Sequence, residues 1–146
     1  MSQVNVFVEV CREGIELPQY AKHGDSGMDV RAAETIELDP HETKVIPTGL
    51  KVAIPLGYEI QIRPRSGLSL KTDLRVSNSP GTIDTGFRDE VGIIITNTGK
   101  NYEVINKGDR IAQMVLSQVP TIQWVEIDNV GSIGQNRGGG FGSTGK

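Results

Sequence analysis

Short runs in which apolar and polar residues alternate dominate the sequence. In the first run, residues 4–10, valines at every second position alternate with Asn5, Phe7 and Glu9. This period of two predicts a strand with one face toward a core. Strands so short and so frequent, separated by turn residues, predict an all-β sandwich, barrel or jelly roll. Similar runs lie at 34–38, 43–47, 50–55, 58–64, 91–96, 102–105, 111–119 and 122–127.

Two segments depart from this pattern. In residues 67–74, Leu68 and Leu74 lie near helical spacing behind Gly67, which predicts a helix of about two turns. After Ile127 the apolar residues become too sparse for the chain to pack on itself. A length of 146 residues suits one domain. We therefore expect a single β domain over 1–130, followed by a flexible glycine-rich arm over 131–146.

Composition and charge narrow the class of protein. The 18 glycines and 7 prolines exceed the average share of about 12% and fall between the apolar runs, as expected for many turns. A net charge of −3 argues against a general nucleic-acid binder, which needs a basic face. The sequence also has no basic leader and no run of membrane-spanning length. We expect a soluble, cytoplasmic protein without nucleic-acid or membrane partners.

Cysteine and histidine usage points to a chain without structural metal. The lone Cys11 has no partner for an internal disulfide, which fits a reducing compartment. His23 and His41 are the only histidines, and no cluster has the spacing of zinc ligands. We expect no structural zinc site.

Five stretches are not explained by a β sandwich alone. Asp29, in "SGMDVRA", follows a turn of small residues, where a carboxylate either caps backbone N–H groups or serves a ligand site. In "PRSGL", Arg65 and Ser66 precede Gly67 and the expected helix. That arrangement favours an anion site over a solvated arginine pair on an edge strand.

The third and fourth stretches add a carboxylate and an amide. Asp84, in "GTIDTGF", follows apolar Ile83 and precedes a turn. Its carboxylate is therefore expected at the end of a rigid strand. There it can act as a general base if it reaches a water. In "GDRIAQMV", Asp109 and Arg110 are expected to form an ion pair in a structural network. Gln113 is an amide in a core strand and needs a hydrogen-bond partner.

The fifth stretch, "RGGGFGSTG", contains the start of a G-x-x-x-x-G-K pattern from Gly140 to Lys146. A phosphate-binding P-loop of that kind follows a strand and opens a helix, and the surrounding residues provide neither. We therefore reject the P-loop interpretation. The glycines nevertheless suit a backbone that must approach ligand oxygens closely.

Taken together and in this order, the five stretches resemble the five motifs of the homotrimeric dUTPase family, and they spread over residues 26–145. Members of this family hydrolyse dUTP to dUMP and pyrophosphate, which limits uracil in DNA and supplies dUMP for dTMP synthesis. The resemblance implies a jelly-roll subunit and a homotrimer. It also implies three active sites at subunit interfaces, each assembled from motifs of all three chains.

The resemblance implies roles for the residues around the reacting phosphate. Asp84 would orient and deprotonate the water that attacks the α-phosphorus. Ser66 would lie near the α,β bridge, while Gln113 would contact the α-phosphate region. The phosphates would be held by Arg65, Ser66 and Gly67.

For the base and the sugar, Asn78 and backbone groups between Thr82 and Gly92, including Ile83, would pair with the edge of uracil. Phe87 stands where the family usually has Tyr, and would stack on the deoxyribose and leave no room for a 2′-hydroxyl. Mg²⁺ would be held mainly by substrate phosphates and water, with Asp29 acting indirectly through the water shell.

The C-terminal arm would fold over bound nucleotide. Arg137 would reach the γ-phosphate and Phe141 would stack on uracil. The remaining donors to the phosphates would be Gly142, Ser143 and Thr144.

The sequence departs from the family pattern in three ways. Phe87 replaces Tyr, and Asp89 stands where Gly is common. The spacing from Arg137 to Phe141 is four residues instead of five. Two rival functions are a dCTP deaminase, which needs a Glu in the strand where this chain has Ile94, and a non-catalytic jelly-roll trimer that binds dUTP or a partner protein. Asp84 favours catalysis over simple binding, because a binder needs no base.

Overall fold

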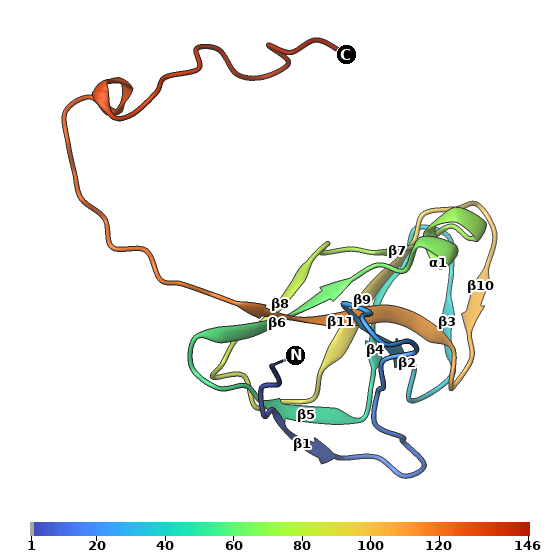
Figure 1. Ribbon diagram of the computed structural model, residues 1–146. Helices are drawn as coiled ribbons and strands as arrows, with labels where there is room; N and C mark the ends of the chain where they lie inside the picture. The colour runs from blue at the N-terminus through green and yellow to red at the C-terminus, as the bar shows by residue number, and fades with distance from the viewer. Residues whose placement is uncertain (1) are drawn as a thin grey trace.

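The computed structural model describes residues 2–146 and consists mainly of short strands (Figure 1). A single short α-helix, α1 (Ser66–Lys71), and a 3₁₀ turn, η1 (Val130–Ser132), are the helical elements of the described chain. The strands are β1 (Phe7–Val10), β2 (Met28–Arg31), β3 (Ile36–Leu38), β4 (Thr43–Pro47), β5 (Leu50–Ala53), β6 (Tyr58–Arg63), β7 (Leu74–Val76), β8 (Gly81–Ile83), β9 (Gly92–Asn97), β10 (Glu103–Ile105) and β11 (Arg110–Gln118).

The strands pair antiparallel in four small sheets. The largest has the order β2-β11-β6-β8, and a second has the order β4-β9-β7. β1 pairs with β5, and β10 pairs with β3. Neighbours in a sheet are often far apart in sequence, as in a jelly roll, where strands from different parts of the chain alternate. The prediction of an all-β, jelly-roll subunit with one short helix is confirmed.

The core lies between the two larger sheets and is built by alternation along the strands. In β9, Ile93 and Ile95 are buried while Ile94 faces outward and is only partly buried. In β6, Ile60 and Ile62 point inward in the same way. Such inward aliphatic side chains stabilise the fold by removing apolar surface from water.

The helix is shorter at its C-terminal end than the sequence predicted. It begins at Ser66 and ends at Lys71, and Leu74 belongs to β7 rather than to the helix. Thr72 adopts an extended conformation, and its hydroxyl donates to the carbonyl of Leu68 and accepts from the N–H of Leu74. The Thr72 side chain therefore satisfies the helix end and starts the next strand, because local side-chain bonds compete with helix continuation.

The N-terminal run forms a strand only over Phe7–Val10, and all four of its residues are exposed. Its partly buried side chains are those of Val4 and Val6, which precede the strand. The prediction that the whole run turns one face to the core of its own subunit is therefore wrong for β1. The strand instead lies on the rim of the body, paired with β5 on one edge.

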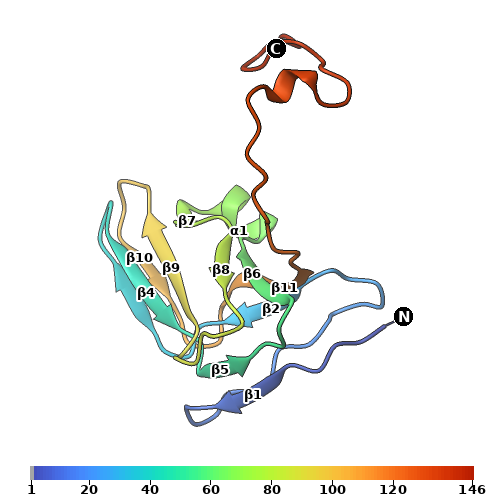
Figure 2. The same ribbon diagram turned by 90° about the vertical axis from the view of Figure 1, so that its left-hand side faces the viewer.

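The run at 122–127, predicted to be a strand, has no strand pairing in the structure. The chain leaves the body after Val119, whose N–H donates to the carbonyl of Gly57, and extends away from the sheets (Figures 1 and 2). Ile122 and Trp124 are 74% and 86% exposed. The strand prediction fails here because the subunit offers no neighbouring backbone to pair with.

Within the part of the chain that the structure describes, no helix has both the length and the apolar character needed to cross a membrane.

Candidate functional site

Asp84 directly follows β8 and lies where the sequence predicted, at the end of a strand. Ile83 is buried and pairs with Ile60 of β6, which fixes the backbone just before the carboxylate. The N–H of Phe87 donates to the carbonyl of Asp84 at 3.1 Å and closes a turn. The hydroxyl of Thr85 donates to the carbonyl of Ile54. Asp84 itself is exposed, so its carboxylate is open to water and to a ligand.

A shallow pocket beside Asp84 is formed by β6, β8, β9 and the connections at both ends of β8. Its lining includes the residues that the sequence predicted to contact the uracil base and the sugar of the nucleotide. Four further residues complete the lining: Ile62, Gly81, Val91 and Ile94. Gly81 allows the Asn78 amide to lie against β8, since a Cβ there would stand 3.2 Å from its Nδ2. The expected residues that line this pocket are Asn78, Thr82, Ile83, Phe87 and Gly92.

The turn geometry accommodates Asp89 without a glycine. Within residues 2–146, positive φ angles outside glycine occur at His41 and Phe141, so Asp89 does not need the left-handed conformation that favours Gly. Arg88 folds back over the turn, and its Nη1 donates to the carbonyl oxygens of Thr85 and Phe87 at 2.7 and 3.0 Å. The extra acidic residue at position 89 is therefore compatible with an ordered turn.

Arg65 and Asp29 form the centre of a second group of residues. The Nε of Arg65 donates to Oδ1 of Asp29 at 2.9 Å, and its Nη1 donates to the carbonyl of Arg110 at 3.2 Å. The Nη1 of Arg110 lies 3.7 Å from Oδ2 of Asp29. One carboxylate from β2 thus lies between two guanidinium groups, one just before α1 and one at the start of β11.

This arrangement changes one expectation about ion pairs. Arg110 pairs with Asp29 rather than with Asp109, whose carboxylate instead accepts from the N–H of Asn106 at 2.9 Å. The predicted Asp109–Arg110 pair is therefore wrong, because adjacent residues on an extended chain point to opposite sides. Arg63, which lies two residues before Arg65, donates to Oε1 of Gln61.

Gln113 has the hydrogen-bond partner that its place in a core strand requires. Its Nε2 donates to the carbonyl of Pro64 at 3.1 Å, and in the register of β11 it lies opposite Asp29 on one side and Arg63 on the other. A Cβ on Gly27 would lie 2.6 Å from Oε1 of Gln113. Gly27 thus lets the turn before β2 pack closely against β11, where a larger residue would displace the Gln113 side chain. A second cavity at this point is lined by Ala21, Asp25, Ser26, Gly27, Asp29 and Gln113.

Ser66 and Gly67 lie at the start of α1, directly after Arg65. Ser66 is exposed and Gly67 is partly buried. The carbonyl of Arg65 accepts from the N–H of Ser69, and the first N–H groups of this turn have no acceptor within the helix.

The C-terminal arm extends away from the sheets of the β domain (Figures 1 and 2). All residues from Gln118 to Lys146 are exposed, and Phe141 has no packing partner in its own chain. Gly138, Gly139 and Gly142 have positive φ angles, a backbone conformation that glycine adopts without steric cost. The structure thus leaves the five candidate residues of the arm apart from the two pockets: Arg137, Phe141, Gly142, Ser143 and Thr144.

The donor set around the pockets suits a metal that takes few protein ligands. Among residues 2–146, no three His, Cys, Asp or Glu side chains converge as metal ligands. Asp29 has a side chain 31% exposed beside the second cavity, and both of its oxygens already face arginines. Mg²⁺ is usually bound through one or two carboxylates, substrate phosphates and several waters, so Asp29 fits contact through water rather than direct ligation.

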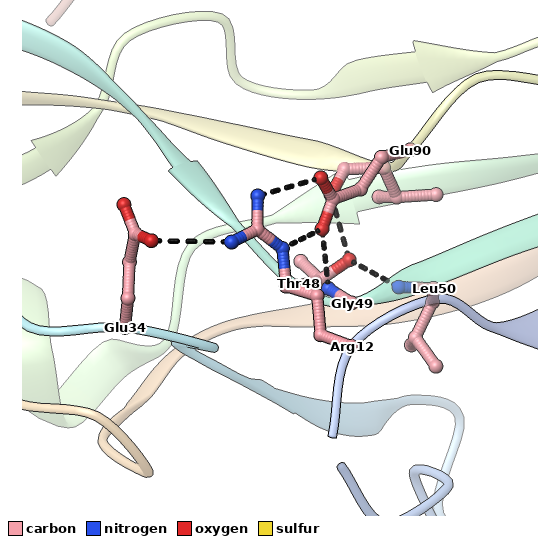
Figure 3. Close-up of polar contacts among 7 residues, drawn as sticks. Arg12, Glu34, Thr48, Gly49, Leu50 and Glu90 are labelled. Atoms are coloured by element: carbon pink, nitrogen blue, oxygen red, sulfur yellow. Dashed lines mark hydrogen bonds and ion pairs between the residues drawn. The ribbon is translucent and has the colours of Figure 1, made fainter. Parts of the chain in front are cut away.

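Sequence reasoning missed a cluster of charged side chains formed by Arg12, Glu34 and Glu90 (Figure 3). The Nε and Nη2 of Arg12 donate to the two carboxylate oxygens of Glu90 at 2.7 and 3.0 Å, and its Nη1 donates to Glu34 at 3.1 Å. The hydrogen bond from Arg12 is the main cause that lowers the pKa of Glu90. These residues share no motif or spacing, so no sequence signal marked them.

Comparison with known proteins gives a consistent result. The family model described as dUTPase matches residues 13–145. A deoxyuridine 5'-triphosphate nucleotidohydrolase from Fusobacterium nucleatum is 45% identical, with 100% of both chains covered. Another from Anaeromyxobacter sp. is 43% identical over 97% of this chain and 99% of its own length.

Solved structures of phage proteins have the same fold. A mutant of the Staphylococcus bacteriophage 80alpha dUTPase with dUpNHpp superposes with a TM-score of 0.88 at 29% identity, covering 99% of this chain and 100% of its own. A mutant dUTPase from phage phi11 of S. aureus, described as revealing the coordination of a structural Mg(II) ion, gives a TM-score of 0.81 at 28% identity. It covers 88% of this chain and 100% of its own.

Proposed function

This chain belongs to the dUTPase family, and from that premise we propose that it is a dUTP diphosphatase, which hydrolyses dUTP to dUMP and pyrophosphate. The observation that carries the proposal is the placement of Asp84. Its exposed carboxylate directly follows the buried Ile83 at the end of β8, beside the pocket lined by Asn78, Thr82 and Phe87. A base at a rigid strand end, next to a pocket, suits hydrolysis better than binding alone.

Uracil enters the pocket between β8 and β9. The Asn78 amide and the backbone groups between Thr82 and Gly92 offer donors and acceptors to its edge, while Ile62 and Ile94 supply apolar surface. The ring of Phe87, 37% exposed, lies at the pocket and stacks on the deoxyribose. Selection against ribonucleotides then rests on shape, since the phenyl ring has no hydroxyl to read the sugar.

The phosphates extend toward the start of α1. The Ser66 hydroxyl and the backbone of Gly67 contact them, and Gln113 approaches the α-phosphate region. Arg65 already uses Nε and Nη1 in bonds to Asp29 and Arg110, and its Nη2 is the nitrogen that contacts the nucleotide in this proposal. A guanidinium held in this way gives a fixed charge without loss of side-chain entropy on binding.

Asp84 orients a water and removes its proton for in-line attack on the α-phosphorus, and pyrophosphate leaves. Mg²⁺ supplies charge neutralisation and orientation of the phosphates when bound. The residues around Asp29 would support its water shell, and phosphate and water would otherwise hold the ion.

The active enzyme in this proposal is a homotrimer with active sites at the subunit interfaces, each assembled from motifs of all three chains and closed by a C-terminal arm. Support comes from the segment that leaves β11: Ile122, Trp124 and Val125 are largely exposed in one chain, and an apolar extended segment of this kind is stabilised when another chain covers it. The arm over 131–146 then closes over nucleotide, with Arg137 at the γ-phosphate and Phe141 on uracil. Gly142, Ser143 and Thr144 donate to the phosphates.

A dCTP deaminase is disfavoured because Ile94 lines the pocket where deamination would need a proton-shuttling Glu. A non-catalytic dUTP binder would not need the exposed Asp84. One assay separates the three functions: the protein is incubated with dUTP, dCTP, dTTP or UTP plus Mg²⁺, and pyrophosphate and ammonia are followed. Pyrophosphate from dUTP alone supports the proposal. Ammonia from dCTP, or tight dUTP binding without turnover, would contradict it.

A further inference from the structure

Arg12 joins three parts of the chain that are distant in sequence. It lies just after β1, Glu34 lies between β2 and β3, and Glu90 lies in the connection from β8 to β9 (Figure 3). The guanidinium binds both carboxylate oxygens of Glu90 and one of Glu34. The Oε2 of Glu90 also accepts from the N–H of Gly49 at 2.8 Å. We call these three side chains the Arg12 cluster.

The cluster holds the far end of the segment that carries Asp84 and Phe87. Directly after Glu90, the N–H of Val91 donates to the carbonyl of Leu50 at 2.8 Å, and the carbonyl of Val91 accepts from the hydroxyl of Thr48 at 2.6 Å. Positions 90 and 91 are thus tied to 48–50 by both side chain and backbone. The near end is held by β8 and by the bond from Thr85 to Ile54.

Between these two anchors, residues 86–89 lie at the surface, and the hydrogen bonds of Phe87 and Arg88 stay within the turn 84–88 itself. The ring of Phe87 is in this stretch, and so its position depends on how well the two ends are fixed. The near anchor consists of buried strand pairing, whereas the far anchor includes one guanidinium at the surface. The side chain of Arg12 is 40% exposed and that of Glu90 is 25% exposed.

We propose that Arg12 is a positioning residue for nucleotide selection: by holding Glu90 in a two-point contact, it fixes the segment 84–91 so that Phe87 faces the sugar of the substrate. This inference rests on the proposed function. Arg12 touches neither substrate nor reacting atoms, and it acts through Glu90.

The chemistry of the contact supports a positional role. An arginine fork on a carboxylate fixes both distance and orientation, which a single-point lysine contact does not. An ion pair this exposed contributes little to global stability. A small shift of a substrate-positioning group, in contrast, costs about 10²-fold in rate for a displacement of about 1 Å. The expected signature is therefore a change in selectivity with little change in melting temperature.

The test compares four variants of the full chain with the parent: Arg12→Ala, Arg12→Lys, Glu90→Gln and Glu34→Gln. Steady-state kinetics with dUTP and with UTP give kcat and KM for each, and thermal melting reports the fold. Glu34→Gln is the matched control, since it removes the carboxylate on the other side of Arg12 and leaves the contact with Glu90.

We expect Arg12→Ala and Glu90→Gln to lower the ratio of dUTP to UTP kcat/KM by about 10-fold, mainly through a higher KM for dUTP. Arg12→Lys should fall between Arg12→Ala and the parent, and Glu34→Gln should match the parent.

Parental selectivity in both Arg12→Ala and Glu90→Gln would overturn the proposal, as would an equal loss in Glu34→Gln. If Arg12→Ala does not fold, the selectivity of Glu90→Gln tests the proposal by itself. The amide oxygen of this Gln still accepts from the N–H of Gly49, so only the ion pair with Arg12 is lost. A parent enzyme that fails to hydrolyse dUTP would refute the proposed function itself. A parent that turns over dUTP with unchanged variants would refute only the role of Arg12.

Discussion

The Oδ1 of Asp29 and the Nε of Arg65 lie 2.9 Å apart although 36 residues separate them in sequence. The contact connects β2 to the start of α1, and Arg110 of β11 approaches the other oxygen of the same carboxylate. Three of the family-like stretches therefore meet at one side chain. The carboxylate orients Arg65 before any nucleotide binds, which preorganises the phosphate end of the site.

Replacing Asp29 with Asn should weaken nucleotide binding more than it slows chemistry. The amide keeps the shape but removes the charge that holds Arg65, and a hydrogen bond to a charged group contributes about 1.5–3 kcal/mol. We expect the Kd of a non-hydrolysable dUTP analogue to rise by roughly 10-fold to 10²-fold in calorimetric titration. Asp109→Asn, which alters only a turn near Arg110, is the control and should bind as the parent does.

Asp84→Asn should bind dUTP nearly as well as the parent and turn it over far more slowly. The substitution keeps the side-chain shape at the end of β8 but removes the proton acceptor, and loss of a general base costs roughly 10²–10⁴ in rate. Single-turnover release of pyrophosphate measures the chemical step directly. Turnover close to that of the parent would show that Asp84 is not the base.

Phe87→Ala should admit UTP. With the ring gone, the space of a 2′-hydroxyl opens at the edge of the pocket, so the ratio of dUTP to UTP kcat/KM should fall. Phe7→Ala is the control, because Phe7 is 76% exposed on β1 and lies outside both pockets. This control should keep the parental ratio of dUTP to UTP kcat/KM. An unchanged ratio in Phe87→Ala would mean that the sugar is recognised by other residues.

The loss of folding stability at acid pH should include a contribution from Glu90. Its hydrogen bond with Arg12 lowers the pKa in the folded state below the ordinary 4.5. A lowered folded pKa means that this stabilisation is complete above the unfolded value and is lost as pH falls through the folded value. Urea unfolding at fixed protein concentration should therefore show that Glu90→Gln is less stable than the parent at pH 7 by a small amount, since a partly exposed ion pair contributes little to global stability. The difference should shrink progressively below about pH 4.5, and a constant difference down to pH 3 would contradict this linkage.

The sequence predicted those parts of the fold that depend on local pattern. Strand β9 was expected at 91–96 and lies at Gly92–Asn97, because alternating burial of Ile93 and Ile95 is written directly in the residue order. The position of Asp84 directly after the apolar Ile83 of β8 was recognisable for the same reason. Strand β7 was not predicted, because Leu74 also fits the helical spacing of residues 67–74.

Non-local contacts could not be read from the sequence in this way. Arg12 and Glu90 are 78 residues apart, and nothing in their spacing indicates that the fold brings them together. The run at 122–127 has strand-like alternation, yet whether it forms a strand depends on a neighbouring backbone. In the subunit it has none, which is why pattern and structure disagree there.

The glycine-rich arm gives the last prediction. A chain that ends at Gln135 should keep the melting behaviour and the assembly state of the parent, because every removed residue is exposed and none contributes to the core. Its dUTP hydrolysis should nevertheless collapse. The arm would bring Arg137 to the phosphates and Phe141 to the base, and loss of even one preorganised donor costs on the order of 10²–10³ in rate.

Fluorescence offers an independent view of the same arm in the full-length chain. Trp124 is the only tryptophan, so Phe141→Trp adds one reporter to one background signal, and the parent serves as the control for Trp124 alone. Emission from the new tryptophan should change when a non-hydrolysable dUTP analogue is added, because stacking on a base and exclusion of water both alter the indole environment. A truncated chain that hydrolyses dUTP as fast as the parent, together with unchanged emission, would show that the arm does not close over nucleotide. The residues that bind the phosphates would then have to lie entirely within the β domain, around Arg65, Ser66 and Gln113.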